Sequence, residues 1–376
     1  MTTRRNAPPE PVPPSFHAEH IGSLLRSDAL KKSFQQYRAG AIRADDYETA
    51  LADAIRGAIR LQEEVGLQSI TDGELGRSSW FGFFFERTGG FRLEPSAFQF
   101  RDAEGGRYEW PTCFACQRMQ RRAPIALDEY RRLASLTKRT PKITLPTPSA
   151  FHFFRFQAPA DRSVYPDEEV YWNDLVEVYR AEIAELGAAG CRYLQLDEVP
   201  LAMLCDPLIR EQVKELGGDP EALAARYVRV LQRILADKPA AMTLGLHLCR
   251  GNFRSRWMAS GGYEPVAERL FNDVPVDAFF LEYDSERAGD FSPLRHVPAG
   301  KHVVLGLVST KSTQLESPDA LRRRIDEATR YVPIERLALS PQCGFASVAG
   351  GNLLSEKDQA AKLRLIVEVA ASIWNS

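Results

Sequence analysis

Short runs of apolar residues alternate with longer amphipathic stretches along most of the chain. Eight short runs end in polar, glycine or proline residues and predict β-strands; they span residues 20–25, 69–74, 142–146, 193–197, 243–249, 278–283, 302–308 and 337–342. Between them, apolar residues recur at helical spacing, as at Leu51, Ile55 and Ile59 before Gly66. Strands that alternate with helices in this way are typical of a parallel α/β fold.

The number of predicted strands favours one architecture. Because eight parallel strands can close on themselves and leave no edge, we expect a (β/α)8 TIM barrel; a doubly wound open sheet is the alternative. Residues 80–123 are rich in aromatic residues and have no clear period, so we interpret them as an insertion after the second strand. Residues 16–376 would then form a single catalytic barrel, and the proline-rich residues 1–15 a disordered arm.

Composition narrows the class of protein. The 48 Lys and Arg residues nearly balance 50 Asp and Glu residues, a net charge of −2, so we expect neither nucleic acid nor a membrane surface as a partner. The chain is 44% hydrophobic and 26% charged, as soluble globular proteins are. No apolar run approaches the roughly 18 residues of a membrane span. Six irregularly spaced cysteines do not suggest a disulfide framework and favour a reduced, cytoplasmic setting.

Polar residues gather at the carboxyl ends of the predicted strands. They are Ser23, Asp72, Glu74, Asp197, Glu198, His247, Cys249, Glu282, Asp284 and Cys343. In a parallel barrel these ends converge on one mouth, so residues far apart in the sequence are expected to meet there. Any single acid in this set is explained equally well as a helix cap.

Four of these residues form a candidate metal site. His247 and Cys249 are two positions apart on a strand, which places both side chains on one face. Imidazole and thiolate ligands suit Zn²⁺, although His-x-Cys alone is a weak motif. Cys343 adds a second thiol at the same mouth, and Glu282 adds an oxygen, with Asp284 as the alternative ligand.

Several short motifs together resemble a known family. They are His-Ile-Gly-Ser (20–23), Thr-Asp-Gly-Glu (71–74), Leu-Asp-Glu (196–198), His-x-Cys (247–249), Glu282 and Ser-Pro-Gln-Cys-Gly-Phe (340–345). In this order they resemble the catalytic barrel of the cobalamin-independent methionine synthase superfamily, and most closely its short, single-barrel members. The resemblance runs from about residue 16 to the C-terminus.

The resemblance implies a zinc-dependent methyltransferase that converts homocysteine to methionine with a 5-methyltetrahydrofolate-type donor. It assigns zinc to His247, Cys249, Glu282 and Cys343. It assigns homocysteine to Ile21, Gly22, Ser23, Glu74 and Asp197, with the two acids on the α-ammonium group. Glu198, next to Asp197 and on the opposite face of its strand, is expected to be structural.

The chain departs from the long enzymes of the family in the half of the site that would bind the donor. Long enzymes carry Asp-x-His-Ser near the end of strand seven, whereas this chain has Ser-Thr-Lys-Ser at 309–312, which makes Lys311 the candidate catalytic acid. Residues 145–149 replace a tryptophan-containing segment that packs against folate. The sequence therefore identifies neither the methyl donor nor any protein that delivers it.

Other interpretations remain at this point. One is an alkyltransferase with a different thiol or electrophile, similar to the epoxyalkane:coenzyme M enzymes; its sulfonate thiol has no ammonium for Asp197 and Glu74 to bind. Another is a zinc-binding or thiol-binding barrel without turnover, which would have little use for the exchangeable carboxylate of Glu282. Cys113-x-x-Cys116 lacks the second cysteine pair of a zinc knuckle and predicts no site.

Overall fold

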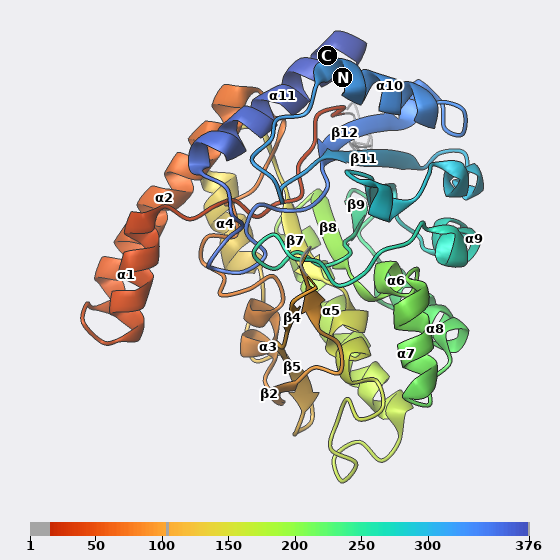
Figure 1. Cartoon of the computed structure of the whole chain (residues 1–376). Coiled ribbons are helices and arrows are strands. Elements are labelled where there is room, and N and C mark those ends of the chain that lie inside the picture. The colour runs from red at the N-terminus through yellow and green to blue at the C-terminus, as the bar shows by residue number, and fades with distance from the viewer. Residues whose placement is uncertain (1–15, 103–104, 375–376) are drawn as a thin grey trace, which may run out of the picture.

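Six parallel strands form the central sheet of the computed structural model, which describes residues 16–102 and 105–374 (Figure 1). In sheet order they are β7 (Ile143–Pro146), β8 (Tyr193–Glu198), β9 (Thr243–Leu248), β10 (Ala278–Glu282), β11 (His302–Val308) and β12 (Leu337–Pro341). Nearly every residue of these strands is buried, which explains why they read as continuous apolar runs rather than as an alternating pattern. The expected arm at residues 1–15 lies outside the described residues.

Both edges of this sheet continue into shorter parallel segments. At one edge, Glu19 donates its backbone N–H to Leu339 O at 2.9 Å, so residues 17–19 run beside β12. At the other, β1 (Ser69–Ile70) pairs with β6 (Thr140–Pro141), which leads directly into β7. Residues 17–19, just before the first predicted strand, and β1 with β6 thus extend the sheet at its two edges.

Two of the predicted strands are wrong in extent. Residues 20–25 form no strand, because Gly22 has a φ of +143° and the backbone turns inward, where Leu24 N–H donates to Gly73 O at 2.9 Å. The second strand ends at Ile70, since Gly73 and Glu74 adopt φ values of +73° and +56°. The parallel α/β class is confirmed, whereas closure into an eight-stranded barrel stays a prediction: no strand ladder joins residues 17–25 to β1 within the described part of the chain.

Most of the helices cover the outside of the sheet. They are α1 (Asp28–Arg38), α2 (Ala44–Val65), α3 (Gly82–Thr88), α4 (Leu127–Leu136), α5 (Glu168–Ala188), α6 (Pro200–Met203), α7 (Pro207–Glu215), α8 (Pro220–Leu235), α9 (Glu264–Asp273), α10 (Pro318–Ala328) and α11 (Glu356–Trp374). In α2 the predicted stripe of Leu51, Ile55 and Ile59 is buried, and Gly66 ends the helix at a φ of +103°. Helix α1 and the adjoining end of α2 project away from the rest of the chain (Figure 1).

Residues 80–123 hold α3 and two small antiparallel pairs, and they lie over the carboxyl ends of the strands. β2 (Phe91–Pro95) pairs with β5 (Pro111–Ala115), and β3 (Phe100–Arg101) with β4 (Arg107–Tyr108). Trp80 N–H donates to Ser347 O at 2.9 Å and Arg101 N–H to Trp257 O at 2.7 Å. The segment thus contacts the loops that follow β12 and β9.

The interior of the sheet contains one fully buried ion pair. Lys142 Nζ lies 3.1 Å from Glu19 Oε2, and neither side chain is exposed. Tyr193 and Ser69 donate hydroxyl hydrogen bonds to the same carboxylate, at 2.8 and 2.7 Å. Burial lowers the pKa of Lys142, and Glu19 opposes that shift.

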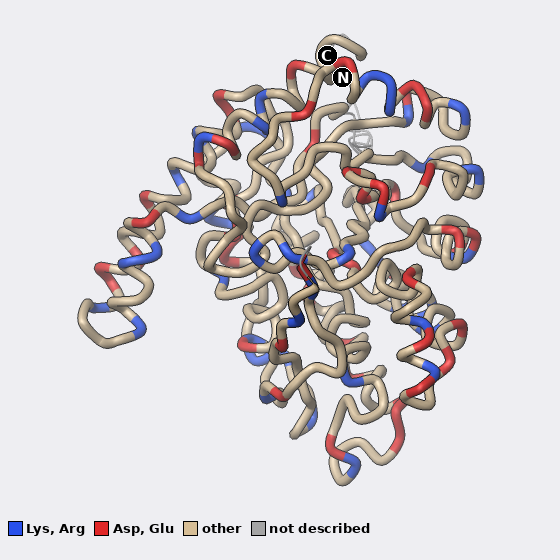
Figure 2. The backbone as a smooth tube through the Cα atoms, viewed as in Figure 1, with Lys and Arg blue, Asp and Glu red and all other residues tan. Residues whose placement is uncertain are grey.

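The outer surface carries both signs of charge. Lys and Arg alternate with Asp and Glu along the outer helices (Figure 2). Within the described residues, no helix combines the length and the apolar character needed to cross a membrane.

Candidate functional site

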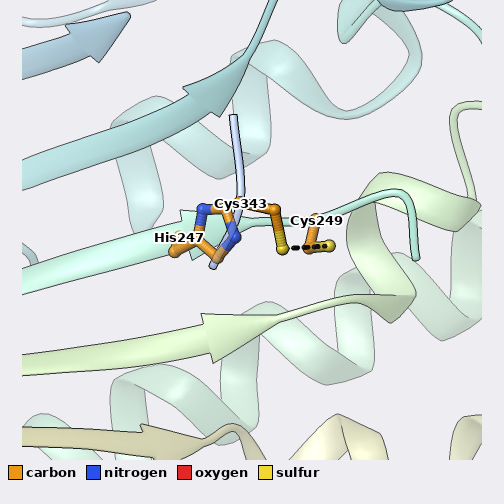
Figure 3. A group of neighbouring side chains, drawn as sticks. All are labelled: His247, Cys249 and Cys343. Atoms are coloured by element: carbon orange, nitrogen blue, oxygen red, sulfur yellow. Dashed lines mark hydrogen bonds between the residues drawn. The ribbon is translucent and has the colours of Figure 1, made fainter. Parts of the chain in front are cut away.

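β9 and β12 bring three metal-binding side chains together. His247 lies in β9, Cys249 follows its last residue, and Cys343 comes two residues after β12 (Figure 3). One ligand atom from each lies within 4.8 Å of the other two, and all three residues are buried. The two Sγ atoms are 3.3 Å apart, and both cysteines are free thiols. The structure thus brings three of the four predicted metal-site residues together.

The donor set fits Zn²⁺. Both ring nitrogens of His247 are buried without a hydrogen-bond partner, an arrangement that costs free energy unless a ligand satisfies them. Two thiols and one imidazole are the ligand types that zinc prefers. No other group of three such residues occurs within 16–102 and 105–374. Cys113 is buried on β5 and the Cys116 thiol contacts Gly90 O, so this pair is outside any metal site found there.

The two thiols are inequivalent. A hydrogen bond from Cys249, together with the neighbouring His247 ring, holds the pKa of Cys343 well below its usual range despite burial. The same hydrogen bond and burial raise the pKa of Cys249. Burial disfavours the charged form of His247, but Cys343 outweighs it and raises the pKa of His247. These shifts favour the thiolate form of Cys343, which is the form of cysteine that binds metal ions, whereas the raised pKa of His247 means that protons compete with a metal for its ring.

Glu282 is adjacent to this cluster but outside the group of three. Its side chain is buried at the end of β10, and Oε2 accepts the Arg250 backbone N–H at 3.1 Å. Oε1 lies 3.5 Å from Arg287 Nη2 and 3.6 Å from Lys311 Nζ. Asp284, the alternative ligand, is 3.6 Å from Arg287. Two cations thus hold the predicted fourth ligand, whose role stays a prediction.

Lys311, the candidate catalytic acid, lies behind Glu282, with Nζ 3.6 Å from Glu282 Oε1, and its role as an acid stays a prediction. It lines a second cavity together with Asp284 and Arg287, and it does not line the cavity that contains His247. Burial would lower the pKa of Lys311, but Glu282 and Asp284 outweigh burial and raise it. A lysine that holds its proton more tightly than usual is a poor acid near neutral pH.

The predicted thiol-binding residues meet beside the metal-binding cluster. A cavity of about 450 Å³ is lined by Ile21, Ser23, Glu74, Asp197, His247, Cys249 and Cys343. Gly22 supports this wall, because a Cβ there would lie 2.6 Å from Glu74 Oε1. Residues that are more than 300 positions apart in the sequence therefore share one cavity. The sequence predicted such a meeting at the carboxyl ends of the strands.

Two buried carboxyl groups face this cavity. Glu74 Oε1 accepts the Thr144 hydroxyl at 2.8 Å, and Asp197 Oδ1 accepts Gln195 Nε2 at 2.8 Å. Burial raises the pKa of Glu74, and it raises the pKa of Asp197 to about 7. Both groups would gain free energy from a cation in the cavity.

Glu198 has the structural role expected of it. Its carboxylate accepts the Ser149 hydroxyl at 2.6 Å and the Leu201 backbone N–H at 2.8 Å. It thereby fixes the start of α6 beside the end of β8.

Sequence reasoning missed the residues that support these acids. Arg77 is buried 3.6 Å from Glu74 Oε2 and 2.6 Å from Glu129 Oε2, so it anchors one carboxylate to α4. Gly344 allows the Ser23 hydroxyl to pack against the backbone next to Cys343, where a Cβ would lie 2.0 Å from Ser23 Oγ. The sequence signal for Gly344 was its place inside the 340–345 motif, and the signal for Arg77 was its position shortly after the 71–74 motif.

Comparison with known proteins identifies the family. Residues 16–372 match the sequence profile described as cobalamin-independent synthase, catalytic domain. The chain belongs to this family. The match covers nearly the whole chain, in agreement with the resemblance seen in its motifs.

Members of the family with similar length exist in bacteria and archaea. The Bacillus subtilis (strain 168) protein YxjH is 40% identical over 366 residues, which cover 96% of this chain and 95% of the relative. The methionine synthase of Pyrococcus furiosus is 26% identical over 326 residues, 86% of this chain and 85% of that protein. A solved structure from Listeria monocytogenes, described as a vitamin-B12 independent methionine synthase, has a TM-score of 0.73 at 29% identity and covers 96% of this chain and 98% of its own.

Proposed function

We propose that this member of the cobalamin-independent synthase family is a zinc-dependent S-methyltransferase that methylates homocysteine to methionine. The observation that carries the proposal is the buried cluster of His247, Cys249 and Cys343, which opens into the same cavity as Glu74 and Asp197. The name of the Pyrococcus furiosus relative supports the same activity.

His247, Cys249 and Cys343 would hold the metal, and Glu282 would complete the set by moving from its two cations. Zinc supplies positive charge that keeps a substrate thiol, with an ordinary pKa near 8.5, in its nucleophilic form at neutral pH. Soft thiolate ligands leave that sulfur reactive because they donate charge to the metal.

The carboxyl groups would orient the substrate. Asp197 and Glu74 accept hydrogen bonds from its α-ammonium group, and the 21–23 turn packs against its carbon chain. The positive charge of the ammonium compensates for the hydration that the two acids lose on burial, which favours their charged forms. The ammonium group of an amino-acid thiol accounts for the two acids in the cavity. A sulfonate thiol has no ammonium group and would leave both acids without a partner.

The proposal also covers the organisation of the chain. Residues 16–376 would form one (β/α)8 barrel, with 80–123 as an insertion that covers its mouth. The six free cysteines favour a reduced, cytoplasmic setting, since buried thiols that serve a metal must stay unoxidised. The partners would be a thiol and a methyl donor, which a second protein could deliver.

Proton release tests the activity of the thiol site without a donor. In weak buffer near pH 7, homocysteine added to the zinc-loaded protein should release about one proton per bound thiol, because the thiol binds as thiolate. The S-methylated product, methionine, should release none from sulfur. Equal proton release by both compounds would contradict the proposed role of the cluster.

A further inference from the structure

Part of the cavity beside the thiol site is lined by aromatic rings that the reaction, as proposed above, leaves without a role. We call this set the aromatic wall: Trp80, Phe81, Phe100, Trp110, Phe154 and Phe253. Neighbouring rings touch, with centroid distances of 5.4 Å from Trp80 to Phe81, 5.9 Å from Phe81 to Trp110, and 5.1 Å from Phe100 to Phe253. Most of the wall comes from residues 80–123, and Phe253 comes from the loop after β9.

The charges around the cavity are mainly negative. Glu74 and Asp197 line its buried end, and no lysine lines it within the described residues. Arg38 is the single arginine on that lining; it is exposed, as is Glu86. A donor that carries carboxylates or phosphates would thus enter a cavity with almost no counter-charge.

Aromatic rings favour an organic cation. The negative face of each ring attracts a positive charge, and this attraction grows when both groups are removed from water. A methylated onium centre fits such surroundings better than an ammonium ion, because its methyl groups are apolar and carry the charge to the ring faces.

The groups available for proton transfer agree with a cationic donor. A methylated amine of the folate type must gain a proton as its C–N bond breaks. Lys311 lies in the second cavity, and the two buried acids are occupied by the substrate ammonium in the proposed function. A sulfonium needs no proton, because it leaves as a neutral thioether.

We infer that the methyl donor is a small methylsulfonium compound whose charged centre binds against the aromatic wall. The homocysteine sulfur attacks the methyl carbon and forms the new C–S bond. The C–S bond of the sulfonium breaks, and its electron pair stays on the departing sulfur. A thiolate and a cation become two neutral thioether groups. The inference rests on the proposed function for the thiol, and it replaces the expectation of a methyl-folate donor.

Donor binding can be measured separately from turnover. Two compounds of similar shape differ in charge: (2-hydroxyethyl)dimethylsulfonium and 3-methylbutan-1-ol. Titration of the zinc-loaded full chain, followed by tryptophan fluorescence, should show at least about ten-fold tighter binding of the sulfonium. Equal affinity for both compounds would overturn the inference.

Variants localise this binding to the aromatic wall. In Trp80→Leu, the affinities for the sulfonium and for the alcohol should differ by no more than about three-fold. Trp80→Phe should keep most of this charge preference, because phenylalanine retains a ring face. Trp374→Leu is the matched control, since Trp374 stacks on His17 at 4.7 Å outside the cavity lining. A charge preference that survives Trp80→Leu and Trp80→Phe alike would place the cation elsewhere and overturn the inference.

A turnover assay tests the identity of the methyl donor separately from the binding of the thiol. With isotope-labelled homocysteine and (2-hydroxyethyl)dimethylsulfonium, mass spectrometry should detect labelled methionine, whereas labelled homocysteine with monoglutamyl or triglutamyl methyl-tetrahydrofolate should give none. Methionine formed from folate but not from the sulfonium would overturn the donor inference and leave the proposed function intact. Proton release with homocysteine reports on the thiol site independently, so its absence would count against the proposed function itself.

Discussion

Substitution of Asp197 by asparagine tests how the cavity recognises the thiol substrate. The side chain is buried and accepts a hydrogen bond from Gln195, which asparagine can keep while it loses the charge. A charge-assisted hydrogen bond to an ammonium contributes about 1.5–3 kcal/mol. We therefore expect the affinity for homocysteine to fall roughly ten-fold to hundred-fold.

Isothermal titration with two thiols isolates this effect. 4-Mercaptobutanoic acid has the carbon chain, carboxylate and thiol of homocysteine but no amine, so its affinity should change by less than about three-fold. Asp174→Asn is a matched control, because Asp174 pairs with Arg118 away from the cavity. Zinc content should be unchanged in both variants. If Asp197→Asn weakened both thiols equally, the acid would have a general structural role and the reasoning would be refuted.

Three further perturbations test other parts of the structure. Gly22→Ala should weaken homocysteine binding in the same titration, because a Cβ would lie 2.6 Å from Glu74 Oε1 at a φ of +143°; unchanged affinity would show that this turn does not shape the site. Zinc affinity, measured against a competing chelator, should fall as the pH is lowered from about 8 to 6, because the raised pKa of His247 lets protons compete with the metal; a flat profile would exclude His247 as a ligand. Lys142→Ala should lower the free energy of unfolding by about 3–5 kcal/mol in urea denaturation, since it leaves Glu19 buried and unpaired; a loss below about 1 kcal/mol would mean that water replaces the ammonium.

The sequence was most informative about the central strands. Residues 243–248 and 337–341 are buried on both faces, so continuous apolar runs marked them directly. The His-x-Cys spacing correctly placed both side chains at one site, although this motif alone did not identify a metal site. Periodicity likewise predicted α2, whose buried stripe repeats every four residues.

The remaining features depend on contacts that no local pattern contains. Gly22 turns the backbone inward because Glu74, 52 positions later, packs against it. Lys311 was assigned from its position in the chain, but its direction is set by Glu282 and Asp284. The aromatic wall comes from irregular segments whose rings meet only in the folded chain. The sequence therefore showed that residues 80–123 are rich in aromatic residues, but it did not show that these rings line a cavity.

Zinc binding by Cys343→Ser tests the central claim most directly. The wild-type protein should bind about one zinc per chain, and the variant, which loses one soft ligand, should bind it at least about ten-fold more weakly against a competing chelator. Cys191→Ser is the control, because Cys191 is also buried but its thiol contacts Tyr193 O outside the cluster. Wild-type zinc affinity in Cys343→Ser would contradict the account.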